Sequence, residues 1–231
     1  MIHHLVFGRK AIVKNEGLIL DLPFQNSFVD ATGKNTMIAG GNSNLPTFTL
    51  EGGEYAATFN GSQSLKTASN LILNSDKVSI SFWIKTTQTT IGLVAELSES
   101  LNSSGNNGFW IINNNTGANK LEFLDRNNLV SSANNIVRPN PNINSGVWQH
   151  IVITSDRALN GANQSKVYVN GVLNFVTVQT NDINNNYGNH ILFIGQRAGS
   201  SLGFNGQIKF LKIFNYPLST TEITNLYNKT M

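Results

Sequence analysis

Residues 146–173 read GVWQHIVITSDRALNGANQSKVYVNGVL and contain two β-rich runs joined by a polar loop. The first run begins at Trp148, and the second ends at Leu173. The second run contains Asn-Gly between alternating apolar residues, a strong hairpin signal because both residues tolerate the positive φ angles of a type I′ turn. The stretch therefore predicts a β-hairpin centred on Asn170 and Gly171.

Alternating apolar and polar residues continue on both sides of this stretch. In KVSISFWIK (77–85), Val78, Ile80, Phe82 and Ile84 share one side of an extended chain and are expected in the core. Trp83 has the opposite parity, and we expect it to pack against a neighbouring segment rather than bind sugar. Similar short runs occur at 17–24, 54–60, 90–98, 108–115, 120–125, 191–196 and 207–216. The pattern predicts an antiparallel all-β fold.

Three further segments have their own signals. Residues 126–146 are polar and interrupted by proline, so we expect a long excursion at one end of the fold rather than a central strand. The run NFVTVQT (174–180) is expected to continue the second hairpin strand. At the C-terminus, Ser219 and Glu222 form a capping-box pattern that predicts a short helix.

Several separated motifs resemble the laminin G-like, concanavalin A-like lectin/glucanase family. They are D-A-T-G-K-N at 30–35, S-F-W-I-K at 81–85, V-W-Q-H-I-V at 147–152, and the run from Gly206 to Ile223. The resemblance implies a β-sandwich jelly roll with a short C-terminal helix over residues 17–231. It also implies that the Trp and His of the third motif mark the core and a sheet edge. Residues 1–16 are weakly patterned and are interpreted as an N-terminal arm or attachment segment.

Length and composition limit the class of protein. A chain of 231 residues suits one large domain. The net charge is +3, but the Lys and Arg residues are scattered, which argues against nucleic-acid binding. The chain has no cysteine, so disulfides, thiolate metal sites and cysteine nucleophiles are excluded. No run has membrane-spanning length or signal-peptide character, so we expect no membrane insertion.

No catalytic residues are expected. Glycosidases need two neighbouring carboxylates, and the E-x-D-x-x-E strand of the glucanase branch is missing. Acidic residues three apart on one strand point to opposite faces, and this excludes the pairs Glu51/Glu54, Glu96/Glu99 and Glu122/Asp125. No G-x-S-x-G nucleophile elbow occurs either.

Many members of the family carry a structural Ca²⁺, so the resemblance raises the same question here. Asp30, Gly33 and Asn35 are candidate ligands from the first loop, because Ca²⁺ takes carboxylate, amide and backbone oxygens. Lys209 stands where the family often has Asp, and its ammonium group would repel or replace the ion. Calcium is therefore an open possibility rather than the favoured one.

Sugar sites combine an aromatic ring with planar polar side chains at loop tips. The candidate ligand-binding residues are Trp110, Tyr187, Arg197, Asn186 and Asn189. They lead to the main hypothesis of a non-enzymatic recognition domain that binds a glycan or cell-surface receptor. We expect its setting to be a virion or another extracellular surface, such as a tail-associated phage protein.

Two other functions stay open. The first is a structural protein that decorates or cements an assembly, with other virion proteins or a homo-oligomer as partners and no glycan ligand. The second, a glycan-cleaving enzyme, is the least favoured because no carboxylate pair was found.

Overall fold

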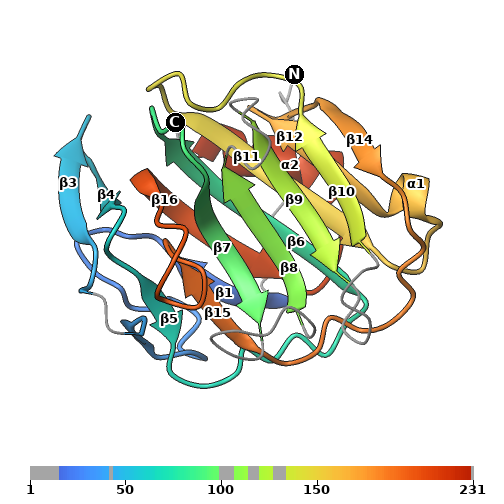
Figure 1. Ribbon diagram of the computed structural model, residues 1–231, viewed down its shortest axis with the longest axis horizontal. Coiled ribbons are helices and arrows are strands. Elements are labelled where there is room, and N and C mark those ends of the chain that lie inside the picture. Colours follow the sequence, from blue (N-terminus) through green and yellow to red (C-terminus); the bar gives the residue numbers. More distant parts are fainter. Residues whose placement is uncertain (1–15, 42–43, 99–106, 114–119, 127–133, 230–231) are drawn as a thin grey trace, which may run out of the picture.

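The computed structural model describes residues 16–41, 44–98, 107–113, 120–126 and 134–229. The expected N-terminal arm lies outside this set except for Glu16. Two antiparallel sheets pack face to face as a sandwich, with sheet B nearer the viewer in Figure 1 and sheet A behind it. The predicted all-β jelly-roll architecture is therefore confirmed.

Sheet A has the strand order β13-β12-β11-β6-β16-β4-β3, with β1 also paired to β16. Its strands are β1 (Leu18–Leu22), β3 (Thr47–Glu51), β4 (Glu54–Asn60), β6 (Lys77–Lys85), β11 (Gln149–Asp156), β12 (Ser165–Val169), β13 (Val172–Leu173) and β16 (Asn205–Phe214). A one-turn helix, α1 (Gly161–Gln164), precedes β12, and α2 (Thr220–Lys229) follows β16. Neither helix is long and apolar enough to cross a membrane, within the part of the chain that the structure describes.

Sheet B has the order β14-β10-β9-β8-β7-β15-β5-β2. Its strands are β2 (Met37–Ala39), β5 (Leu65–Thr67), β7 (Gly92–Ser98), β8 (Asn107–Asn113), β9 (Leu121–Arg126), β10 (Asn134–Pro139), β14 (Phe175–Gln179) and β15 (Ile191–Ile194). One side chain in two from each sheet points into a shared apolar core. On β6 these are Val78, Ile80, Phe82 and Ile84, as the alternation predicts.

The predicted hairpin is present. Val169 pairs with Val172, and Asn170 and Gly171 between them have φ angles of 52° and 80°. Positive φ at both central residues is the signature of a type I′ turn. The same hairpin is tied to β11, because the Asn170 side-chain oxygen accepts a hydrogen bond from the His150 backbone N–H.

Three expectations about strands are wrong. The run 174–180 does not prolong the hairpin: after Asn174 the chain crosses to sheet B, where β14 pairs with β10. The proline-containing segment 126–146 holds β10, a strand inside sheet B, because Pro139 is its last residue and interrupts no ladder within it. In β16 the alternation breaks at a bulge between Lys209 and Lys212, where Phe210 has a φ of 53°.

The C-terminal helix is also confirmed. The Ser219 backbone N–H and hydroxyl both donate to the Glu222 carboxylate, and the Ser219 hydroxyl accepts a longer bond from the Glu222 N–H. The helix covers part of the outer face of sheet A with Ile223 and Leu226. Tyr227 extends this cover by stacking on Trp83 and His150.

Candidate functional site

The outer face of sheet B carries the candidate site, and Trp110 on β8 lies at its centre. Glu96 of β7 and Leu124 of β9 lie directly opposite Trp110 on the neighbouring strands, so all three side chains share this face. Trp110 packs in a small apolar cluster with Leu93, Ile112 and Leu124, separate from the main core. Its side chain is only 9% exposed.

Two arginines flank the Trp110 ring. The Arg126 guanidinium carbon lies 4.3 Å from the ring centroid and that of Arg197 lies 4.4 Å away. Arg126 is two residues beyond Leu124 on β9, whereas Arg197 comes from the 196–204 loop that follows β15. A guanidinium stacked on an indole gains cation–π energy and has its orientation fixed by the ring. Arg126 is buried, whereas Arg197 is half-buried.

Glu96 anchors the loop that carries Arg197. Its Oε1 accepts hydrogen bonds from the Ala198 backbone N–H at 2.8 Å and from the Ser98 hydroxyl at 3.1 Å. Burial raises the pKa of the Glu96 carboxyl above its usual value, although these hydrogen bonds and the charges of Arg197 and Arg126 act in the opposite direction. Glu96 therefore positions the loop and offsets part of the arginine charge.

The same loop is fixed at three other points. The Arg197 N–H donates to the Ser201 carbonyl, and the Leu93 N–H donates to the Leu202 carbonyl, which brings Leu202 onto the Trp110 cluster. Gly199 packs so closely that a Cβ there would lie 2.6 Å from the Gly40 carbonyl carbon. These contacts give Arg197 a defined place next to β8.

Two buried polar atoms at this site lack a protein partner among the described residues. They are Glu96 Oε2 and the Trp110 indole nitrogen, which lie on adjacent strands. Leaving such groups unpaired costs free energy, and functional sites often contain them.

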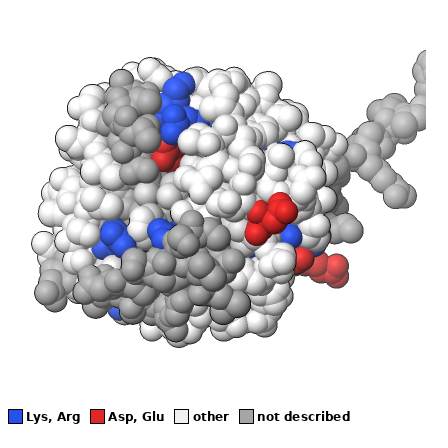
Figure 2. Space-filling model, turned by 45° about the vertical axis from the view of Figure 1, so that its right-hand side comes forward, with Lys and Arg blue, Asp and Glu red and all other residues white. Residues whose placement is uncertain are grey.

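The face as a whole has more positive than negative charge. The positively charged side chains on this face are Lys66, Arg126 and Arg138, which point outward by strand register, and Arg197, which comes from its loop. The negatively charged side chains are those of Glu96 and Glu122. Arg138 and Glu122 form an ion pair of 2.5 Å. Figure 2 shows a surface that is mostly uncharged, with Lys and Arg in small separate groups. Once Arg138 is paired with Glu122, the other three cationic side chains on this face remain against the single carboxylate of Glu96.

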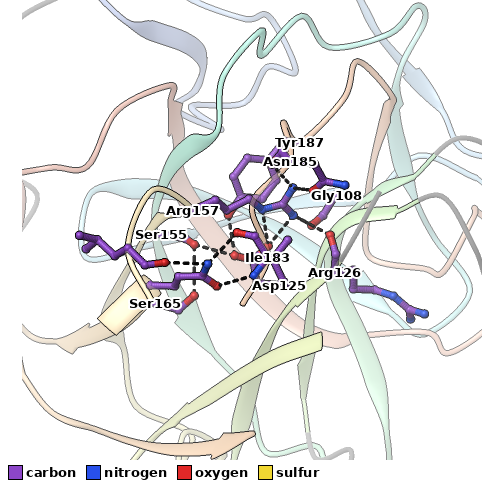
Figure 3. Close-up of polar contacts among 11 residues, drawn as sticks. Gly108, Asp125, Arg126, Ser155, Arg157, Ser165, Ile183, Asn185 and Tyr187 are labelled. Carbon is purple, nitrogen blue, oxygen red and sulfur yellow. Dashed lines mark hydrogen bonds and ion pairs between the residues drawn. The ribbon is translucent and has the colours of Figure 1, made fainter. Parts of the chain in front are cut away.

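Tyr187 lies elsewhere, in the interior between the sheets (Figure 3). Its side chain is 0% exposed, its hydroxyl donates to Asp125 Oδ2 at 2.9 Å, and the Arg157 guanidinium lies 3.6 Å from its ring centroid. The expectation that this ring is available to a sugar at a loop surface is wrong, because the ring completes a buried polar network. Figure 3 also shows the Arg126 side chain pointing away from that network.

The two candidate asparagines are not part of the Trp110 site. Asn189 links two loops: its side-chain oxygen accepts from the backbone N–H groups of Leu73 and Asn74, and its amide donates to the Asn74 side chain. Asn186 is exposed next to the buried Tyr187. Of the five candidate binding residues, the structure brings together only Trp110 and Arg197.

The candidate calcium loop is closed by its own hydrogen bonds. Asp30 receives bonds from the backbone N–H groups of Asp21, Thr32 and Asn35 and from the Thr32 and Asn35 side chains. Burial alone raises the pKa of the Asp30 carboxyl, but these hydrogen bonds outweigh it and hold the pKa below its usual value. Gly33 donates its N–H to the Asp30 carbonyl. Donors rather than oxygens surround the carboxylate, so this loop does not fit a calcium ion.

Metal-binding side chains do not cluster elsewhere in the described part of the chain either. Among the described residues, no three His, Cys, Asp or Glu side chains gather closely enough to hold a metal. Lys209, the residue that argues against calcium in the family pattern, lies 4.8 Å from the Trp148 ring centroid and 5.7 Å from that of Trp83. Trp83 and His150 are buried on the outer face of sheet A, consistent with structural roles.

Sequence reasoning missed Arg126 and Glu96. Arg126 has the same outward parity as Glu122 and Leu124. Extending the predicted strand 120–125 by one residue would have placed Arg126 on the face of Trp110. The spacing of Glu96 from Glu99 argues only against a catalytic pair and says nothing about binding. Parity also misjudged Glu51 and Glu54: a two-glycine turn separates them, so they pair across a hairpin rather than share a strand.

Solved structures share this architecture. Domain 4 of AbnA, a GH43 extracellular arabinanase from Geobacillus stearothermophilus, solved in complex with arabinotriose, covers 91% of this chain and 98% of its own, with 23% identity and a TM-score of 0.69. The receptor binding domain of the botulinum neurotoxin C/D mosaic serotype covers 94% of this chain and 52% of its own, with 17% identity and a TM-score of 0.68. The binding domain of Paraclostridial Mosquitocidal Protein 1 covers 93% and 52%, with 15% identity and a TM-score of 0.67. The chain spans about half the length of the last two domains, and similarity at these identities shows a common fold.

No curated protein sequence matches the chain. A model of the family described as the concanavalin A-like lectin/glucanases superfamily matches residues 59–224, which is more than half of the chain. The matched region runs from the end of β4 into α2 and includes the Trp110 site. The chain therefore belongs to the concanavalin A-like lectin/glucanase superfamily.

Proposed function

We propose that this domain is a non-catalytic carbohydrate-binding module that holds a carboxylated sugar, such as a uronic or sialic acid unit, at the Trp110 site. The observation that carries the proposal is the pair of guanidinium groups held 4.3 and 4.4 Å from one indole ring. Oriented guanidinium groups bind carboxylates through charge-assisted hydrogen bonds. Trp110 then acts by positioning the arginines, because its ring has little exposed surface left for stacking on a sugar.

A sugar is preferred over other carboxylates for two reasons. The chain belongs to a superfamily described by its lectins and glucanases, and one structure with the same fold was solved in complex with arabinotriose.

The arrangement of acids favours binding over glycoside hydrolysis. Glu96 and Glu122 share the outer face of sheet B, but β8 lies between their strands and their registers differ by two residues. A glycosidase needs two carboxyl groups that act on the substrate. Here Glu122 is already paired with Arg138, and Glu96 Oε1 accepts bonds from the Ala198 N–H and the Ser98 hydroxyl.

The experiment compares two variants that each remove one positive charge. Arg197→Gln removes a guanidinium from the site, whereas Lys166→Gln removes an ammonium from β12 on the other sheet. On an array of uronic-acid, sialic-acid and neutral glycans, we expect the unmodified protein to bind acidic glycans. Calorimetry should then show that Arg197→Gln weakens the best acidic ligand by about 10- to 100-fold, while Lys166→Gln stays within about twofold.

Either of two results would overturn the proposal. One is the absence of binding to every acidic glycan, and the other is equal affinity in both variants. A reducing-end assay on the same polysaccharides tests the enzyme alternative, because product formation would contradict a purely binding role.

The assembly alternative and the setting stay predictions. If the domain decorates or cements a particle, native mass spectrometry should show a closed homo-oligomer. Its placement on a phage virion or another extracellular surface is tested by locating the protein in purified particles with a specific antibody.

A further inference from the structure

The outer face of sheet A has a part that α2 leaves open. The helix and the chain before it cover Val152, Tyr168 and Phe214, and Tyr227 extends the cover to Trp83 and His150. Beyond Tyr227, Lys85, Gln207 and Thr58 lie side by side on β6, β16 and β4. These three side chains are half-buried, so their polar ends reach the surface.

A pocket of about 230 Å³ opens among these strands. Its lining comes from β4, β6, β16 and the turn before β11. Apolar atoms form most of the exposed lining, and polar groups come from Thr58, Lys85, Thr87, Asn205 and Gln207. Pockets for drug-sized ligands are larger, about 300–1,000 Å³. This volume therefore suits a single sugar ring of a longer chain.

Several hydrogen-bonding groups of the pocket are available to a ligand. Gln207 Nε2 donates to the Thr58 hydroxyl at 3.3 Å, which leaves Gln207 Oε1 as an open acceptor. Thr58 Oγ1 also lies 2.7 Å from Thr49 Oγ1, so the Gln207 amide is oriented by a small network. Among the described residues, no protein group is bonded to the Asn205 side-chain amide or to the Thr87 hydroxyl.

An aromatic ring stands beside the pocket. Trp148 is half-buried, and its ring centroid lies 5.9 Å from Lys85 Nζ and 4.8 Å from Lys209 Nζ. Lys85 is one of the lining residues, so the ring and the pocket share a neighbour. Sites that bind sugar rings usually combine an aromatic ring with amide and hydroxyl groups.

The charges around this pocket balance. Glu51 bonds Lys85 Nζ through both carboxylate oxygens at 2.7 Å. Burial lowers the pKa of Lys209, while the charges of Glu54 and Glu51 act to raise it, so two lysines face two glutamates. This differs from the Trp110 site, where arginine charge is in excess.

We propose that this pocket is a second, independent binding site that takes an uncharged sugar residue. Gln207, Asn205 and Thr87 would bind its hydroxyl groups, and Trp148 would cover its apolar side. The site needs no ligand at Trp110, because the two sites lie on the outer faces of opposite sheets (Figure 1). A domain with both sites can hold two glycan segments at once, one acidic and one neutral.

The test uses neutral trisaccharides as probes, arabinotriose and maltotriose, with trigalacturonate as the acidic probe. Two-dimensional NMR of the ¹⁵N-labelled full chain follows the side-chain amides of Gln207 and Asn205 and the indole signals of Trp148 and Trp110. We expect at least one neutral probe to shift the first three signals and to leave Trp110 unchanged.

Matched variants make the test specific. Thr58→Val and Gln207→Leu remove polar groups from the pocket, whereas Thr177→Val and Gln179→Leu make the same changes on β14 at the far edge of sheet B. We expect the pocket pair to weaken the neutral probe by about fivefold or more and the β14 pair to leave the affinity unchanged. Amide spectra that retain the dispersion of the unmodified protein confirm that each variant is folded.

Two outcomes would overturn this second site. One is that no neutral probe shifts the pocket signals, and the other is that the folded pocket variants bind as tightly as the unmodified protein. The outcome is separable from that of the Trp110 site, because Arg197→Gln should weaken trigalacturonate and leave the neutral probe unaffected.

Discussion

The Arg157 guanidinium and the Asp125 carboxylate form an ion pair of 2.6 Å, and both side chains are completely buried between the sheets. Arg157 also donates to the backbone carbonyls of Gly108, Arg126 and Asn185, which joins β8, β9 and the loop before Tyr187. Asp125 accepts further bonds from the Ser155 and Tyr187 hydroxyls. The network satisfies both charges and links the two sheets at one end of the core.

Arg157→Met should therefore be strongly destabilising. It leaves the Asp125 charge buried without its cation, and removing one partner of a buried pair costs about 3–5 kcal/mol. Urea denaturation measures this loss. Lys77→Met is the matched control, because it breaks the partly exposed Lys77–Asp156 pair and should cost less than about 1 kcal/mol. Similar losses in both variants would show that burial does not set the energy of the Arg157 pair.

His150 should make the fold sensitive to acid. Burial lowers the pKa of His150 from 6.5 to about 4, so the unfolded chain binds a proton in this range that the folded protein does not. Stability then falls as the pH drops from 6.5 to 4, by about 3 kcal/mol for this residue. Urea denaturation across this range should show a weaker pH dependence for His150→Gln. If His150→Gln shows the same pH dependence of stability as the unmodified protein, His150 is not held neutral in the folded state.

Glu96 should have the opposite effect on pH dependence. Burial raises its pKa above 4.5, so the folded protein favours the protonated form and stability falls as the pH rises above 4.5. Glu96→Gln should remove this decrease and keep the bond to Ala198, because a glutamine oxygen can accept it. Glu96→Ala loses that bond, and we expect weaker binding of acidic glycans by calorimetry. Identical binding by Glu96→Ala and the unmodified protein would show that Glu96 does not position Arg197.

The C-terminal helix should depend on its first residue. Ser219→Ala removes the hydroxyl that completes the capping box with Glu222, at a cost of about 1 kcal/mol. Thr224→Ala changes an exposed residue of the same helix and should stay within about 0.5 kcal/mol. Thermal unfolding of the two variants measures the difference. Equal melting temperatures would indicate that packing against sheet A, rather than the cap, holds the helix.

Elements that depend on near neighbours follow from the sequence. The Asn170-Gly171 turn needs only two residues that accept positive φ, and the capping box needs only Ser219 and Glu222 three positions apart. The inward set on β6 follows from a period of two between Val78 and Ile84. These features are local, so residue types and spacing are sufficient to predict them.

Three features depend on residues far away in the sequence. They are the crossing of β14 to sheet B, the strand within 126–146 and the bulge at Phe210. Each depends on which distant strand offers free backbone groups, and a short polar run does not reveal its partner. The positions of the core strands were therefore predictable from their strong alternation, whereas the pairing of these segments was not.

The binding residues show the same division. Sequence chemistry proposed Trp110 and Arg197 as separate candidates, and it proposed Tyr187 because asparagines surround it. Tertiary structure stacked Arg197 and Arg126 on Trp110, through strand register on one side and a folded loop on the other, and enclosed Tyr187 with Arg157. Residue type and spacing set the two-layer β architecture, because burying alternate apolar side chains is a local demand. Which polar side chains meet was decided by contacts between segments far apart in the chain, because only the packed sheets bring those segments together.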